Sequence, residues 1–472
     1  MVCTSQAGEQ PGVERYLCMT KNMTEGKILP LLLKFMLPLL LGNLFQQTYN
    51  TVDAAIVGQV LGADALAAIG ASSSVQFLIL GFCIGTCCGF CVPVAQRFGA
   101  RDYTCMKSYV FHACILSVIF AAVLTAACAF LCPWILKLLS TPDEIFQEAY
   151  LYLLIIFLGI PFVFLYNLTA GILRAAGDSR TPFLFLAFST CVNIGLDLFF
   201  IIVLNWGVAG AAIATITSQG MSGALCLFYI LKKVPILYPG RENRRFSSAY
   251  TRTMLAMGIP MGLQYSITAI GSMVMQASNN SLGTVYITGF TAGMKLKQFM
   301  ICPFDALATS VCNFCGQNLG AGKMERVKKG IRVGALAGIL YGIAAGLIFI
   351  FCGRTLSLLF VSAESVEVLD ASARYLRCMG YCFWVLGILN VARQAIQGLG
   401  YAGRAVFAGV VEMIARCTVC LAFVPIYGYG AICWADQCAW ITATLYLVPT
   451  CLYCIRKLEK ELQSGSSSQP QH

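Results

Sequence analysis

The chain has 472 residues, of which 58% are hydrophobic and only 11% are charged. A water-soluble protein of this length needs far more charge on its surface, so this balance excludes a soluble globular protein. The formal net charge of +11 does not indicate nucleic-acid binding, because the basic residues lie in short connections between long apolar segments, as in membrane proteins.

The apolar segments are about 20 residues long or longer, and they lack the apolar–polar alternation of β-barrel strands. They predict an all-α, multi-pass membrane protein in a lipid bilayer. In chain order the twelve predicted spans are 31–53, 65–92, 108–132, 149–172, 183–204, 208–231, 254–276, 284–313, 332–353, 372–394, 404–425 and 430–454.

The longest connection, 232–253, is polar and basic, and it separates two sets of six spans. We expect a first lobe at 31–231 and a second lobe at 254–454. The segment 1–30 is polar and lacks an apolar core followed by a cleavage site, so we expect no signal peptide. The end of the chain, 455–472, is expected to be a disordered cytoplasmic tail, and its last part, 461–472, is of low complexity.

Basic residues are concentrated in every second connection, while the other connections contain Lys137 and Arg354. Cytoplasmic connections are enriched in Lys and Arg, so this distribution predicts that both termini are cytoplasmic. We expect the protein in the cytoplasmic membrane of a bacterium.

The two halves carry the same landmarks in the same order. The segment QRFGA at 96–100 recurs as QNLGA at 317–321, and MLPL at 36–39 corresponds to GIPM at 258–261. Such repeats indicate duplication, and an even number of spans per copy gives both copies the same orientation. The expected substrate site is the cleft between the two copies.

The first span ends on a carboxylate. A charged residue within a span costs about 2.5–3.5 kcal/mol on insertion scales, so it is a candidate functional residue. Four polar residues spaced three or four apart share one helical face, with Tyr49 close by: Asn43, Gln46, Asn50 and Asp53. This face is expected to border protein or a water-filled cavity. The alternative is that Asp53 only caps the helix and contacts water.

The fifth span carries a second polar set, in which Ser189, Asn193 and Asp197 follow one another at intervals of four. Two carboxylates in one dehydrated pocket do not ionise together easily, so Asp53 and Asp197 predict a site for H⁺ or Na⁺. The alternative is an interhelical hydrogen bond worth about 1 kcal/mol.

The second half lacks a matching pair of acidic residues. The seventh span places Gln264, Thr268 and Ser272 on the matching face, but Met275 falls opposite Asp53. We therefore expect ion coupling in the first half alone. Residues expected to line the substrate cleft are Gln46, Tyr49, Asn50, Gln264, Thr268, Met275 and Lys297.

Other charged residues lie within spans of the second half. Lys295 and Lys297 are expected to pair with an acid such as Asp305 or Asp436, and the alternative is contact with an anionic substrate. Glu412 and Arg416 are four residues apart on one helix, so we expect them to neutralise each other.

The sequence gives no support for an enzyme, a cofactor or a firm metal site. It has two His residues and no phosphate-binding loop for ATP. The 24 Cys residues lie mostly within apolar spans, where small buried side chains are expected.

Several motifs in this order resemble the MATE (multidrug and toxic compound extrusion) transporters. They are Pro38, NTVD at 50–53, LRAAGDSRTP at 173–182, the pair Asn193 and Asp197, and GQNLGAGK at 316–323. The resemblance implies a V-shaped, twelve-helix antiporter that exports amphipathic, often cationic, small molecules in exchange for H⁺ or Na⁺.

In that family the residues matching Asp53, Asn193 and Asp197 form a cation site, and the proline matching Pro38 lies where the first helix bends. One branch also uses acids in spans seven and ten. This chain has none at mid-depth there, which places it nearer the bacterial DNA-damage-inducible branch.

Two other functions are compatible with the sequence. The nearer one is a flippase for lipids or lipid-linked saccharides, in which Lys295, Lys297 and Arg393 would bind an anionic headgroup. The more distant one is a channel or receptor. Two internal repeats already make a cleft, so we expect a monomer.

Overall fold

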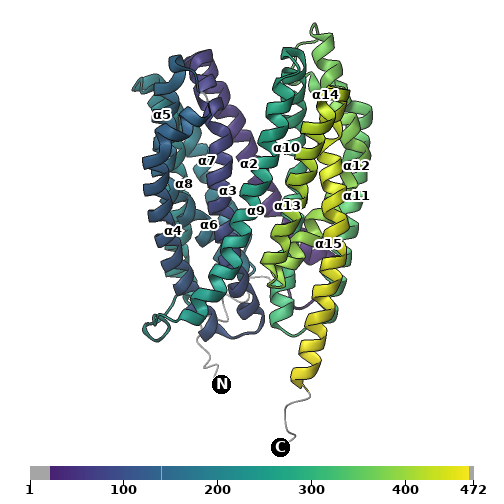
Figure 1. The fold of residues 1–472 in the computed structure, drawn as a ribbon. Coiled ribbons are helices and arrows are strands. Elements are labelled where there is room, and N and C mark those ends of the chain that lie inside the picture. The colour runs from purple at the N-terminus through teal and green to yellow at the C-terminus, as the bar shows by residue number, and fades with distance from the viewer. Residues whose placement is uncertain (1–21, 140, 467–472) are drawn as a thin grey trace, which may run out of the picture. The chain divides into compact units, whose positions relative to one another are not determined.

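The computed structural model describes residues 22–139 and 141–466, and every regular element among them is helical (Figure 1). The first half contains α2 (Ile28–Val60), α3 (Ala63–Gly99), α4 (Tyr103–Leu138), α5 (Asp143–Leu158), α6 (Ile160–Ala175), α7 (Arg180–Leu198), the π-helical turn η1 (Phe199–Val203) and α8 (Gly207–Lys233). Two 3₁₀ turns follow, η2 (Pro235–Leu237) and η3 (Arg241–Asn243).

The second half contains α9 (Ser248–Asn280), α10 (Thr284–Gly320), α11 (Met324–Ser357), α12 (Val366–Gly398), α13 (Ala402–Thr418), the π-helical turn η4 (Val419–Phe423), α14 (Val424–Tyr427) and α15 (Tyr429–Ser466). Within the described residues, 10 helices are long and apolar enough to cross a membrane, and the pair α5 and α6, bent by 42°, makes up to 11. The all-α multi-pass fold is thereby confirmed. The predicted seventh span coincides with α9, which is not among these candidates.

The end of the chain differs from the prediction. We expected 455–472 to be disordered, but α15 continues to Ser466. Lys457 and Glu461 are an i, i+4 pair with 3.7 Å between Nζ and Oε1, and Glu459 forms an ion pair with Lys328. The first pair lies on one face of α15 and suits a helix, and the second joins α15 to α11. Residues 467–472 lie outside the described part of the chain.

The connection between the halves is shorter than expected and is attached to the first half. The flanking helices leave 234–247 between them, instead of 232–253. The Asn243 side chain donates to the carbonyl of Thr104 (3.1 Å), and the Ser247 amide donates to Nε2 of His112 (2.9 Å).

Two compact units divide the chain within helices rather than between them. The first unit comprises 22–25 and 37–262, and the second comprises 26–36 and 263–466. Both transitions lie next to a proline inside a helix, Pro38 in α2 and Pro260 in α9. The lobe limits expected from sequence, 31–231 and 254–454, follow the connections instead.

Close backbone approach explains why the start of α9 belongs to the first unit. A Cβ atom added to Gly89 of α3 would lie 2.6 Å from the Gly258 Cα atom of α9. Only glycine allows helices to approach this closely. In the second unit, Arg326 donates to the carbonyl of Gly26 (2.8 Å).

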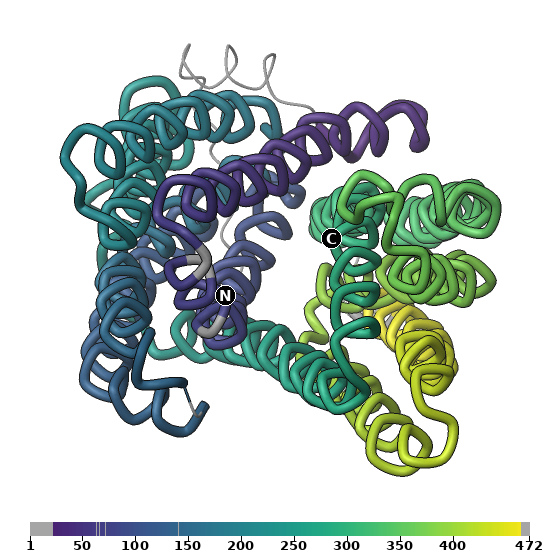
Figure 2. The backbone as a smooth tube through the Cα atoms, turned by 90° about the horizontal axis from the view of Figure 1, so that it is seen from above, coloured from purple at the N-terminus to yellow at the C-terminus, as the bar shows by residue number. Residues whose placement is uncertain are grey.

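Helices α11 and α12 of the second unit also pack through glycine. A Cβ atom on Gly342 would lie 2.5 Å from the Trp384 Cα atom, and Gly338 faces Gly387. Figure 2, which looks along the helices, shows those of each unit as coils packed side by side. These bundles hold the polar side chains described next.

Candidate functional site

The polar face of α2 lies against α7 within the first unit. Gly42 lies against Leu186, whose Cδ2 atom would be 3.5 Å from an added Cβ atom, and the Phe45 and Phe183 rings are 6.0 Å apart. Three spans separate α2 from α7, so the two helices run in the same direction. Asp53 lies eleven residues after Gly42, and Asp197 likewise lies eleven residues after Leu186.

This register places the two carboxylates at the same level of the helix pair, and Asp53 is close enough for its charge to act on Asp197. Asn193 lies one turn before Asp197 and is 2% exposed, while Asp197 is fully buried. The structure therefore brings together the three residues expected to bind a cation, and their role stays a prediction.

Five buried polar atoms of this site have no hydrogen-bond partner in the part of the chain that the structure describes. Both oxygens of Asp197, both amide atoms of Asn193 and Oδ1 of Asp53 are buried without a hydrogen bond. Burying such groups unpaired is costly, so they favour a proton or a cation between them. Carboxylate and amide oxygens are suitable ligands for hard cations such as Na⁺.

An apolar cluster closes one end of the site. Val57 and Ile201 lie one turn beyond Asp53 and Asp197, and both belong to one buried cluster with Tyr152. The π-helical turn η1 begins two residues after Asp197, and such turns frequently occur at functional sites. The cluster keeps water away and so strengthens the electrostatic interactions within the site.

Two residues of this site were not identified from sequence. The Tyr152 side chain of α5 interacts with the Gln76 side chain of α3, and both carboxylates act on Tyr152 electrostatically. Tyr152 lies within the apolar run LYLLIIF, where a tyrosine gives no signal of its own.

Predicted substrate residues lie in different environments. On α2, Gln46 and Tyr49 are half-buried and Asn50 is exposed. On α9, Gln264 is buried and accepts a hydrogen bond from the Gln397 side chain (2.5 Å), while Met275 is buried.

Gln264 and Met275 therefore pack inside the second unit instead of lining an open surface, contrary to expectation. Thr268 is half-buried and donates to the Gln264 carbonyl (3.0 Å). An i−4 bond of this kind is typical of threonine in membrane helices.

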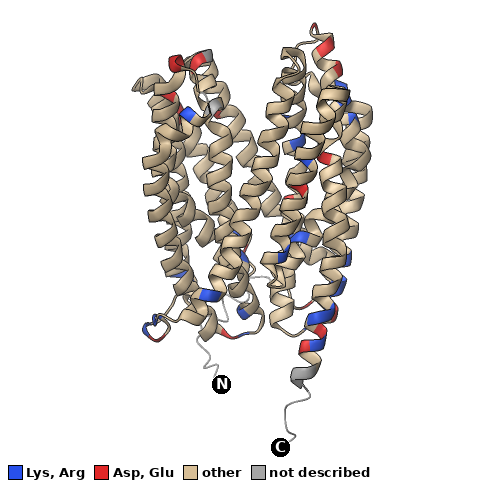
Figure 3. Cartoon of the chain, viewed as in Figure 1, with Lys and Arg blue, Asp and Glu red and all other residues tan. Residues whose placement is uncertain are grey.

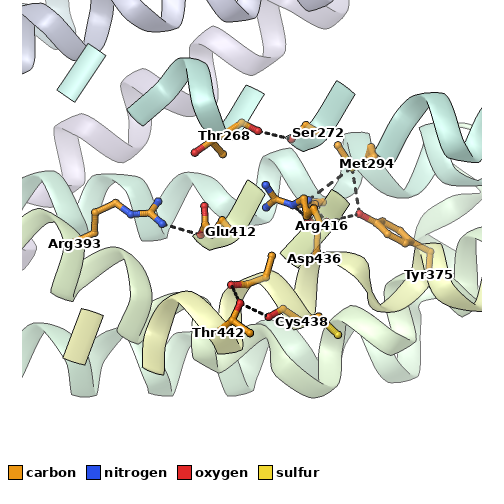
Figure 4. A network of polar contacts seen from close by, with 12 residues as sticks. Thr268, Ser272, Met294, Tyr375, Arg393, Glu412, Arg416, Asp436, Cys438 and Thr442 are labelled. Atoms are coloured by element: carbon orange, nitrogen blue, oxygen red, sulfur yellow. Dashed lines mark hydrogen bonds and ion pairs between the residues drawn. The ribbon is translucent and has the colours of Figure 1, made fainter. Parts of the chain in front are cut away.

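The second unit contains a buried network of charges centred on α15 (Figure 4). Asp436 accepts from Lys297 Nζ (2.5 Å), Tyr375 Oη (3.0 Å) and Arg416 Nε (2.8 Å). Of the two partners considered for Lys297, the structure selects Asp436.

The expected pair of Glu412 with Arg416 is wrong. Glu412 accepts from Arg393 Nη2 of α12 (2.7 Å), and Arg416 turns to Asp436. The reason is that both side chains find well-aligned partners on neighbouring helices, and charge-assisted bonds with good geometry stabilise buried ions. Lys295 is exposed, and its Nζ lies 5.5 Å from the centre of the Phe360 ring.

A family model described as MatE matches this chain twice, at residues 38–199 and 260–421. The chain belongs to the MatE family. The two matches fall in the two halves, in agreement with the repeated landmarks. This match confirms the resemblance to MATE transporters that the sequence motifs indicated. MATE proteins are membrane transporters and not enzymes. The branch within the family stays a prediction.

Several known proteins resemble this chain over most of its length. "Probable multidrug resistance protein YpnP" of Bacillus subtilis (strain 168) is 33% identical over 381 residues, which are 80% of this chain and 84% of that protein. An "FAD transporter" of Shewanella oneidensis is 24% identical over 370 residues, which are 78% and 81% of the two chains. A solved multidrug resistance MATE family transporter in an outward-facing conformation has a TM-score of 0.86 at 20% identity, covering 96% of this chain and 100% of that chain.

Proposed function

We propose that this protein is a secondary antiporter that exports amphipathic, often cationic, small molecules in exchange for H⁺ or Na⁺. The observation that carries the proposal is the set of half-buried Asp53 and buried Asn193 and Asp197, in which five buried polar atoms have no hydrogen-bond partner among the described residues. The names of relatives such as YpnP, and of the similar solved transporter, support multidrug export.

Coupling then follows because two ionised carboxylates in one enclosed site repel each other, which costs free energy. Entry of a cation neutralises Asp53 and Asp197, and the polar face of α2 can repack against α7. The cation must bind the two conformational states with different affinity, since otherwise it cannot drive the change. The apolar cluster at Val57 and Ile201 maintains that difference by excluding water.

We assign coupling to the first unit alone. Each π-helical turn lies at the end of one MatE match, η1 from Phe199 and η4 from Val419. The charged residue shortly before η1 is Asp197, and the one before η4 is Arg416. At this position the second unit carries the permanent positive charge of Arg416, which is already bound to Asp436. The first unit carries the Asp197 carboxylate there, which can bind a mobile cation.

We also propose that both termini face the cytoplasm, that the protein lies in the plasma membrane of a bacterium, and that it acts as a monomer. Within each unit, Lys and Arg are concentrated toward one end of the helices, where the basic connections lie (Figure 3). This asymmetry supports a cytoplasmic location for those ends.

The flippase alternative is not favoured. It used Lys295, Lys297 and Arg393 to bind a headgroup, and of these Lys295 alone is exposed. Lys297 is paired with Asp436 and Arg393 with Glu412, and all four of these side chains are at most 10% exposed. Two of the three cations, Lys297 and Arg393, are therefore paired with acids of the same unit.

Transport in proteoliposomes tests the proposal. Purified protein is reconstituted, a pH or Na⁺ gradient is imposed, and movement of ethidium is followed by fluorescence. Asp53→Asn and Asp197→Asn are expected to lower gradient-driven transport at least about tenfold, because each removes a carboxylate from the site. The control is Asp64→Asn, which changes an exposed acid of the same unit. Wild-type rates in Asp53→Asn would contradict the proposal.

A further inference from the structure

Helix α10 presents a polar face to its surroundings. Thr291, Gln298 and Asp305 follow one another at intervals of seven, and all three are exposed. A carboxylate within a helix of membrane-spanning length is not stable against lipid, so this face must border water. Ile301, one turn before Asp305, is half-buried and supplies an apolar contact on the same face.

Asp305 lies near a cation but is not paired with it. Arg393 acts electrostatically on Asp305, yet no ion pair or hydrogen bond of the Asp305 side chain occurs among the described residues. Arg393 donates Nη2 to Glu412, while its Nε is buried and has no partner. The carboxylate of Asp305 thus remains available to another cation.

The position of Asp305 at one end of the buried charge network explains why its carboxylate is available to a ligand. Positive and negative side chains alternate along it, and both ends lie on α10: Asp305, Arg393, Glu412, Arg416, Asp436 and Lys297. Short bonds join Arg393 to Glu412 and join Arg416 and Lys297 to Asp436, while Glu412 acts on Arg416 only electrostatically. Asp305 is the one exposed member, so an arriving ligand can bind it without breaking an internal pair.

We propose that the Asp305 carboxylate is a docking point in the second unit for the cationic group of a transported molecule, in competition with the Arg393 guanidinium. This inference rests on the proposed function, and it names the ligand class as amphipathic organic monocations. The charge of the ligand meets Asp305, its apolar part lies on Ile301, and Arg393 keeps its bond to Glu412.

Binding in detergent micelles tests the inference, with ethidium as the cationic probe and N-phenyl-1-naphthylamine as a neutral probe, both followed by fluorescence. Asp305→Asn is expected to raise the Kd for ethidium about tenfold, equivalent to about 1.4 kcal/mol. The Kd for the neutral probe is expected to stay unchanged, which also reports that the variant is folded. Asp305→Glu should bind ethidium like the wild type.

A second arm tests the competition. The double variant Arg393→Gln, Glu412→Gln removes the competing cation together with its buried partner, and it is expected to bind ethidium several-fold more tightly. The matched control is Glu367→Gln, which removes an exposed acid of the same unit and should change neither Kd.

Three results would overturn the inference: an unchanged ethidium Kd in Asp305→Asn, an equal loss of both probes, or an equal effect of Glu367→Gln. Because binding is measured without an ion gradient, it is independent of coupling. Failure of gradient-driven export by the wild type would instead contradict the proposed antiport.

Discussion

Asp436→Asn is expected to lower the free energy of unfolding by about 3–5 kcal/mol, because removing one partner of a buried ion pair leaves an uncompensated charge. Asp436 is 1% exposed, and its oxygens accept from Lys297 (2.5 Å), Arg416 (2.8 Å) and Tyr375 (3.0 Å). Asparagine keeps an acceptor but has no negative charge, so two buried cations lose their shared counter-charge.

A double-mutant cycle separates this electrostatic effect from lost packing. Lys297→Met removes one of the two cations, so Asp436→Asn should cost about 2 kcal/mol less in that background than in the wild type, within the range found for contacting residues. Stability is measured by titrating the protein in mixed micelles with a denaturing detergent and following tryptophan fluorescence.

The control is Asp370→Asn. Its ion pair with Arg354 (3.1 Å) is exposed, at 58% for Arg354 and 62% for Asp370, so losing it should cost less than about 1 kcal/mol. The reasoning is refuted if Asp436→Asn costs no more than this control. It is also refuted if the two substitutions of the cycle are additive within about 0.5 kcal/mol.

Three further outcomes are expected. Tyr152→Phe should lower gradient-driven transport several-fold with unchanged yield of folded protein, because it removes the hydroxyl that interacts with Gln76 and with both carboxylates. Gly342→Leu should abolish folded protein on size-exclusion chromatography, since a Cβ atom there would lie 2.5 Å from the Trp384 Cα atom. Gly195→Ala should give wild-type yield, because its Cβ atom would meet nothing within 4 Å.

The sequence by itself was sufficient for the class of protein and for part of the candidate site. Long apolar segments can satisfy their backbone in a membrane only as helices or closed barrels, and their composition indicated helices. Helical periodicity placed Asp53 on one polar face and Asn193 with Asp197 on another. The repeated landmarks anticipated the two matches to the MatE family.

Only the tertiary structure decided which helices meet and at what register. Periodicity identifies the face on which a side chain lies, but not the helix opposite that face. For this reason Glu412 and Arg416 were paired wrongly, and Tyr152 was not recognised. The division of the chain next to Pro38 and Pro260 was also hidden, because it depends on close backbone approaches between helices distant in sequence.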